Sequence, residues 1–155
     1  MSIERSAWCL RLGIGCLGVG EMEFEFLIPE RPVSLQARRR QRLREWQQFV
    51  ADEAAKTWDK APITDCQLQL TLIYLCGEFP VDTDNIIKPI LDALKGLVYE
   101  DDILISDVES RRRSLSLVSD YNTIRWPDQL LRGLLSGGEC VYVRISGQPI
   151  LEDKL

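Results

Sequence analysis

Residues 66–98 read CQLQLTLIYLCGEFPVDTDNIIKPILDALKGLV, and this stretch contains a strand, a loop and a helix in succession. Its first part, 66–76, alternates apolar side chains on one face and becomes apolar on both faces at its far end, which predicts a central β-strand. After a loop over 77–84, isoleucines and leucines recur at helical spacing and predict a helix over 85–98. The strand and the helix together predict a sheet with a helix packed on it, and the remaining strands must come from other parts of the chain.

The flanking sequence supplies those strands and a second long helix. Residues 21–28 (EMEFEFLI) alternate apolar and acidic side chains and predict a half-buried strand. Ser34 is expected to cap a helix that runs to about Trp58. The downstream elements are strands from Ile103 to about Val118 and over 140–145, and a loop over 121–138 with a short helix opened by Pro127. These elements predict an α/β fold, more closely α+β, in which two main helices cover a small mixed sheet.

The chain of 155 residues has the length of one domain, and domain-like patterning begins at Met22. We therefore expect a single domain over 22–155, preceded by an N-terminal extension or an extra strand over 1–21. The apolar run 7–20 is too short to span a membrane and is interrupted by Arg11, so no membrane partner is expected. A signal peptide is the less favoured interpretation of this run.

Histidine is absent from the sequence. This excludes Ser-His-Asp triads, Cys-His pairs and His-ligated zinc sites, so any metal or acid-base chemistry must use carboxylates, Lys, Tyr or Cys. The five cysteines form no C-x-x-C pair, and most lie in apolar runs. They are interpreted as reduced core thiols, as is typical of a protein of the cytoplasm.

The acidic residues are concentrated in one segment. Residues 78–109 hold nine acids and two lysines, a net charge of -7, whereas the whole chain carries -5 and the remainder is therefore +2. A net negative charge argues against a nucleic-acid partner. Its concentration in one segment is what a cation-binding site requires.

That segment contains candidate metal ligands. In extended backbone, Asp82 and Asp84 would point the same way, and Asp101-Asp102 returns toward them after the predicted helix. Carboxylates converging in this way suit Mg2+ or Mn2+, which lowers the pKa of a bound water and neutralises phosphate charge in phosphodiester hydrolysis. Lys88, four residues after Asp84, could hold a phosphate oxygen.

Other interpretations of the D-x-D pair are weaker. Asp82, Asp84 and Asn85 could simply cap a helix, although the ordered acids that follow favour a site. An EF-hand would need an oxygen ligand and a glycine where Ile86 and Ile87 stand. A haloacid-dehalogenase-like phosphatase would need an uninterrupted apolar strand before the first Asp, where this chain has Gly, Glu and Pro.

The run from Asp82 to Lys88, followed by Asp92-Ala-Leu, Gly96, Asp101-Asp102 and Asp107, resembles the signature of RusA-type Holliday-junction resolvases. The resemblance implies that Asp82, Asp84 and Asp102 bind Mg2+ and that Lys88 is the catalytic lysine. It implies auxiliary roles for Asp101, Asn85 and Asp107. It also implies a homodimer that introduces paired nicks into branched DNA during recombination and repair. Where the family carries basic residues before the first Asp, this chain has Gly-Glu-Phe-Pro-Val.

Arginines supply candidate contacts to DNA phosphates, namely Arg38, Arg39, Arg40, Arg42, Arg111 and Arg113. The first four could equally form the solvated face of a long helix. Alternation along a strand allows at most two of residues 111–113 to share a face. A catalytically silent or differently specific relative that binds DNA or a protein is the alternative to a junction nuclease.

Overall fold

The computed structural model describes residues 22–116 and 126–149, and its centre is one four-stranded mixed sheet. The strands are β1 (Glu23–Ile28), β2 (Leu68–Cys76), β3 (Ile105–Ser114) and β4 (Cys140–Gly147), in the order β1-β4-β2-β3. Strand β4 is antiparallel to β1 and β2, whereas β2 and β3 are parallel. The predicted α+β class with a small mixed sheet is therefore confirmed.

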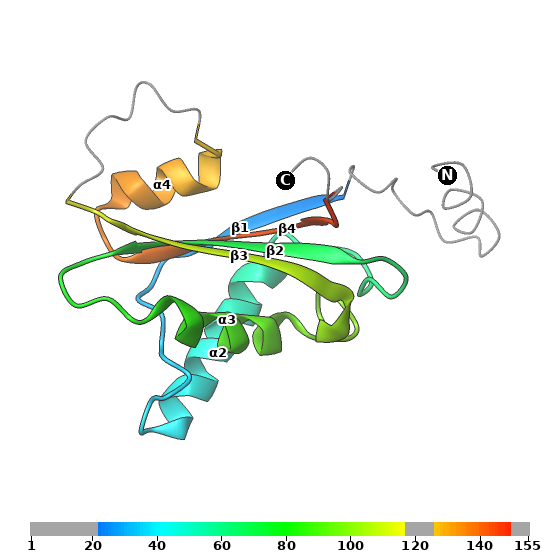
Figure 1. Ribbon diagram of the computed structural model, residues 1–155, viewed down its shortest axis with the longest axis horizontal. Coiled ribbons are helices and arrows are strands. Elements are labelled where there is room, and N and C mark those ends of the chain that lie inside the picture. The colour runs from blue at the N-terminus through cyan, green and yellow to red at the C-terminus, as the bar shows by residue number, and fades with distance from the viewer. Residues whose placement is uncertain (1–21, 117–125, 150–155) are drawn as a thin grey trace.

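Helices cover both faces of this sheet. Helices α2 (Arg40–Ala55) and α3 (Thr83–Leu94) lie on one face, and α4 (Asp128–Ser136) lies on the other (Figure 1). The short helix α4 begins directly after Pro127, as predicted. Two helices do cover one face, and the third packs against part of the opposite face.

The main core lies between the sheet and helices α2 and α3. The alternating side chains of β2 that the sequence assigned to one face are fully buried, namely Leu68, Leu70, Leu72 and Tyr74. They pack in one cluster with buried residues of the helices, including Trp46 and Ile90. Complete burial of each aliphatic side chain contributes about 1.5–3 kcal/mol, so β2 anchors the fold.

A smaller core lies under α4. Leu130 and Leu134 pack against Leu75, Cys140 and Tyr142 on the far face of the sheet. Gly133 allows this approach, since a Cβ at this position would lie 2.7 Å from the Cys140 sulfur. Two cysteines of the described residues, Cys76 and Cys140, are buried free thiols.

Helix α2 begins later than the sequence predicted. Ser34 does not cap it: its hydroxyl accepts a hydrogen bond from the Gln36 amide at 3.1 Å, and its carbonyl accepts one from Ala37 at 2.9 Å. These bonds form a separate turn, and the helix starts at Arg40 and ends at Ala55. Ser34 therefore satisfies its neighbours locally, which is the usual competing role of serine near a helix start.

Helix α3 and strand β3 are also shorter than predicted. Helix α3 ends at Leu94, because Gly96 adopts a φ of 82° and its amide donates to the Tyr99 carbonyl. A 3-10 turn over Asp102–Leu104 precedes β3, which ends at Ser114. The predicted extension or strand over 1–21 lies outside the described residues. Among the helices that are described, none is long and apolar enough to cross a membrane.

Candidate active site

The D-x-D pair lies at the start of α3 and is not extended as the sequence suggested. Asp82 precedes the helix in an extended conformation, whereas Thr83 and Asp84 already belong to its first turn. The two carboxylates therefore do not point the same way by strand alternation. Both residues are exposed, and Asp82 forms no side-chain capping hydrogen bond. Asp84 still complements the positive end of the helix dipole.

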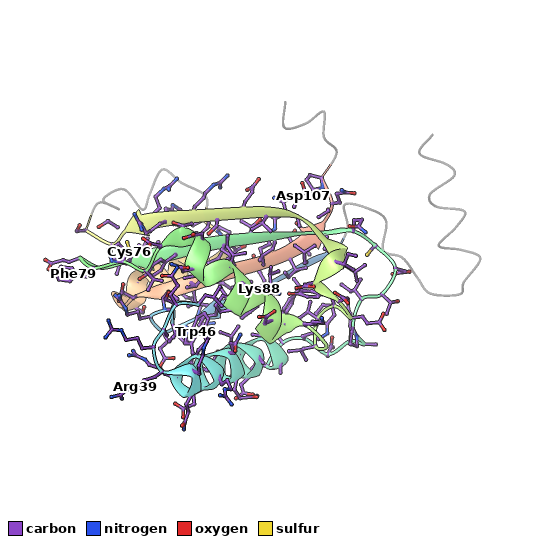
Figure 2. The ribbon with its side chains drawn as sticks, turned by 60° about the horizontal axis from the view of Figure 1, so that its bottom comes forward. Arg39, Trp46, Cys76, Phe79, Lys88 and Asp107 are labelled. Carbon is purple, nitrogen blue, oxygen red and sulfur yellow. The ribbon has the colours of Figure 1, made fainter. Side chains whose placement is uncertain are left out.

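One turn further along α3, Lys88 connects two acids. Its Nζ lies 2.8 Å from Asp92 Oδ1 and 2.7 Å from Asp102 Oδ2. We call these three residues the Lys88 cluster. The contact with Asp102 joins residues that are 14 apart in the sequence, and it draws the start of the 3-10 turn to the exposed face of α3. Figure 2 shows Lys88 on this helix.

The Lys88 cluster is charged at neutral pH. The hydrogen bond to Asp102 raises the pKa of Lys88 above its usual range, and the hydrogen bond to Asp92 raises it further. The hydrogen bond from Lys88 in turn holds the pKa of Asp102 below its usual range. The side chains are 49% exposed at Lys88, 40% at Asp92 and 28% at Asp102, so solvent reaches all three. A ligand could reach them by the same route.

Asp101 orients the turn that carries Asp102. Its side chain accepts a hydrogen bond from the Ile103 amide at 3.1 Å, which caps the 3-10 turn. Lys95 lies 3.7 Å from the same carboxylate. The buried Tyr99 fixes the preceding chain by donating to the Leu91 carbonyl at 2.7 Å. Asp101 therefore has a structural role next to the site.

The donors suit a hard cation, but their arrangement does not form a ready metal site. Carboxylate oxygens are the ligands that Mg2+ prefers. Across residues 22–116 and 126–149, however, no three acidic or cysteine side chains come close enough together to hold one ion. Asp102 is instead bound to the ammonium of Lys88. The predicted set of Asp82, Asp84 and Asp102 would have to rearrange in order to share a metal.

The arginine-rich segment is tied to the start of α3 through Asn85. Pro89 lacks an amide hydrogen, so the Asn85 carbonyl has no helical partner four residues later. The Leu35 amide takes that place and donates to the Asn85 carbonyl at 3.0 Å. This bond brings the turn that precedes α2 to the D-x-D pair. The basic side chains that follow are all exposed, namely Arg38, Arg39, Arg40 and Arg42.

The arginines of β3 alternate between the faces of the sheet. Arg111 pairs with Ile73 and lines a hollow on the same face as α4. Arg113 pairs with Leu75, which also faces α4. Arg112 lies between them, and its Nη1 donates to the Val81 carbonyl at 3.4 Å. The arginine beside the D-x-D pair is therefore Arg112, which was not among the predicted DNA contacts.

Asp107 is not part of the group around Lys88. It pairs with Gln69 in the sheet and accepts a hydrogen bond from the Ser106 hydroxyl at 2.7 Å. Figure 2 shows Asp107 on β3, well separated from Lys88. The structure thus separates this acid from the other predicted site residues.

A second charged group, which the sequence did not reveal, holds the loop that leads to Asp82. Glu139 accepts hydrogen bonds from the Tyr74 hydroxyl at 2.7 Å, the Gly77 amide at 3.0 Å and Arg31 at 3.0 Å. Arg31 also donates to the Phe79 carbonyl at 2.6 Å. We call Glu139, Arg31, Tyr74 and the Gly77 amide the Glu139 cluster.

Hydrogen bonding keeps Glu139 ionised although it is mostly buried. Burial alone would raise the pKa of this carboxyl group, but the hydrogen bonds from Gly77, Tyr74 and Arg31 outweigh it and lower the pKa. Glu139 directly precedes β4 and lies 62 residues from Gly77 in the sequence. No local pattern signals a contact of this length, so it could not be predicted from spacing.

Comparison with known proteins identifies one family. The family model described as endodeoxyribonuclease RusA matches residues 30–116. This range includes α2, β2, α3 and β3, and therefore every residue of the Lys88 cluster and the D-x-D pair. It ends before α4 and β4. No curated protein matches the chain.

Proposed function

The chain belongs to the endodeoxyribonuclease RusA family, and from this premise we propose that it is a Mg2+-dependent endonuclease that resolves Holliday junctions by paired nicks. Mn2+ is the expected substitute for Mg2+. Its proposed setting is DNA recombination and repair in the cytoplasm. The nuclease class follows from the family. The metal, the junction preference and the paired nicks are the parts that need an experiment.

The observation that carries this proposal is the contact between Lys88 and Asp102. It places a cation and a carboxylate on the exposed face of the helix that begins with the D-x-D pair. Phosphodiester hydrolysis needs acidic metal ligands and a positive group near the scissile phosphate. These groups lie on one helix and the turn beside it, and solvent can reach them.

We assign the metal-ligand role to Asp82, Asp84 and Asp102. A bound Mg2+ would supply an activated water and neutralise charge on the phosphate. Lys88 stays protonated because its two acidic neighbours raise its pKa, so it can offer charge to a phosphate oxygen. Asp92 shares Lys88 with Asp102 and keeps its ammonium on the exposed side of α3.

The proposed DNA surface combines the start of α2 with the edge of β3. Arg38, Arg39, Arg40 and Arg42 would contact phosphates, and the bond from Leu35 to Asn85 ties their segment to the site. Arg112 extends this surface next to Val81. We retain Arg111 and Arg113 as DNA contacts on the other face of the sheet, where a second arm of a junction could lie. A homodimer would supply the two sites that paired nicks require.

A catalytically silent family member that binds DNA or protein is the second candidate. Two observations favour it: no three acidic side chains meet in the described residues, and the whole chain carries a net charge of -5. A silent protein would gain no stability from Mg2+, whereas a metal that binds only the folded state raises its stability.

The test uses three DNAs of related sequence: a four-way junction, a flap and a plain duplex. Each is incubated with the protein in EDTA, Mg2+ or Mn2+, beside an Asp84→Asn variant. We expect metal-dependent nicks in opposing strands of the junction, lost in the variant. Cleavage of all three DNAs would discard junction specificity, and a folded protein that cuts none of them would leave the silent binder.

A further inference from the structure

The most exposed of the large apolar side chains in the described part of the chain is Phe79, with 80% of its surface accessible. It lies in the loop between β2 and α3, three residues before Asp82. Figure 2 shows its ring projecting from one end of the molecule, away from the neighbouring elements. Phenylalanine stabilises a fold chiefly through burial, so this ring contributes little to the core.

The exposure of Phe79 does not come from an unsupported backbone. Its carbonyl accepts a hydrogen bond from Arg31 Nη2 at 2.6 Å. The Glu139 cluster fixes Arg31 and also the Gly77 amide, two residues before the ring. On the other side of the loop, Arg112 donates to the Val81 carbonyl at 3.4 Å. Anchors on both sides thus hold the loop in a position that presents the ring to solvent.

The charges around Phe79 limit what it can contact. Glu78 precedes it and Asp82 follows it, and both are exposed. Residues 77–82 contain two acids and no Lys or Arg, so their own side chains do not attract DNA phosphates, a contact that is left to Arg112 beside them. A base is different, because the face of any of the four bases is uncharged and can stack on an aromatic ring. In a duplex these faces are covered by neighbouring pairs, whereas a branch can leave one open.

We propose that Phe79 determines substrate specificity by stacking on an unpaired base at the branch of the DNA, next to the cutting site. This proposal rests on the proposed nuclease function for the site, but binding can test it without cleavage. Stacking would favour branched DNA over duplex and would place the branch at a fixed distance from the D-x-D pair.

The test measures equilibrium binding by fluorescence anisotropy in EDTA, so that no DNA is cut. The probes are a four-way junction with two unpaired nucleotides at its branch point and a plain duplex of the same arm sequence. The proteins are the wild type, Phe79→Ala, Phe79→Trp and the control Leu135→Ala. Leu135 is 72% exposed but lies in α4, on the other face of the sheet from α3. Thermal unfolding of each variant checks that it is folded.

We expect Phe79→Ala to lose about 5- to 100-fold in affinity for the junction, the range that base–aromatic stacking supports. Its affinity for the duplex should stay the same, and Phe79→Trp should restore junction binding. Leu135→Ala should bind as the wild type does. Equal junction affinity in Phe79→Ala and wild type would overturn the proposal, and so would an equal loss on both DNAs.

Cleavage in Mg2+ separates this proposal from the nuclease function. If the wild type cuts the junction but Phe79→Ala binds it equally well, only the stacking role fails. If the wild type binds through Phe79 but never cuts, the nuclease function fails and the stacking role stands. A wild-type protein that binds neither DNA would overturn both.

Discussion

The Lys88 cluster and the Glu139 cluster use similar groups in opposite ways. In the Glu139 cluster one mostly buried carboxylate accepts from three segments of the chain, and its side chain is only 20% exposed. In the Lys88 cluster one cation serves two carboxylates, and all three side chains are at least 28% exposed. The first arrangement fixes the loop after β2, because one carboxylate joins Tyr74, the Gly77 amide and Arg31. The second can exchange partners with a ligand at little cost, because exposed ion pairs are weak.

This comparison indicates where stability and activity should separate. Substitutions in the Lys88 cluster should change metal binding and cleavage while leaving unfolding almost unaltered. Substitutions in the Glu139 cluster should lower the free energy of unfolding. They should alter metal binding and cleavage only as far as they move the loop before Asp82.

The largest effect is expected from Asp102→Asn. Loss of one proposed ligand should reduce Mg2+-dependent junction cleavage by more than about a hundredfold, since even residues that only support metal ligands cost 10- to 100-fold. The melting temperature should change little, because the lost ion pair is exposed. Initial cleavage rates and thermal unfolding of the same preparation check both parts. A variant that cuts normally, or one that is strongly destabilised, would contradict the division.

Glu139→Ala should chiefly affect stability. It removes the acceptor of the buried Tyr74 hydroxyl and of the Gly77 amide, and one of the two acceptors of Arg31, which should cost about 1–3 kcal/mol in the free energy of unfolding. Urea unfolding measures this change. Glu23→Ala is the control, because its pair with Arg144 is exposed and should contribute at most about 1 kcal/mol. Equal losses in the two variants would show that the Glu139 cluster has no special role.

Lys88→Met should change metal affinity in the opposite direction to activity. Removing the ammonium frees Asp102, so Mn2+ affinity measured by isothermal titration should rise about two- to fivefold, the scale of an exposed ion pair. Cleavage should fall, because the proposed contact with the phosphate is lost. Lys95→Met, in which the lost contact is a 3.7 Å approach to Asp101, serves as the control. Weaker Mn2+ binding in Lys88→Met would show that the lysine supports the metal site rather than competing for it.

The smallest effect concerns pH. The pKa of Glu139 is lower in the folded protein, so the folded state favours the ionised form and unfolding takes up a proton at acidic pH. The contribution of Glu139 is therefore complete above the ordinary glutamate pKa, about 4.3, and is lost as pH falls through the lowered value. The difference in unfolding free energy between wild type and Glu139→Gln should be constant from pH 6 to 8 and shrink below about pH 4. A difference that grows in acid would contradict a lowered pKa of Glu139 in the folded protein.

Sequence patterning predicted those parts of the fold that depend on burial. The alternation in β2 and the apolar stripe of α3 correctly placed Leu70 and Ile90 in the core, because each element has one periodicity and one buried side. Element ends were less predictable. Ser34 has the chemistry of a helix cap but forms its own turn, and Gly96 stops α3 four residues before the predicted end at Val98.

At the candidate site, the sequence predicted that Lys88 and the acids after it come together, but it did not predict the backbone conformation around them. The order of acids around Lys88 identified the exposed face of α3, and Lys88 does contact Asp102. The expectation that Asp82 and Asp84 share one extended stretch was wrong, because the helix starts between them. Arg112 and Glu139 were missed because their partners are 31 and 62 residues away in the sequence, distances that local spacing does not encode.

The most direct test compares two neighbouring acids, Asp102 in the 3-10 turn and Asp107 in β3. Asp102→Asn and Asp107→Asn remove carboxylates five residues apart, one bound to Lys88 and the other pointing to the opposite face of the sheet. Both variants and the wild type are incubated with a four-way junction in Mg2+, and the nicks are mapped on each strand. We predict that the wild type and Asp107→Asn cut opposing strands and that Asp102→Asn does not. Cleavage by Asp102→Asn at the wild-type rate would contradict the assignment of the site to the Lys88 face of α3.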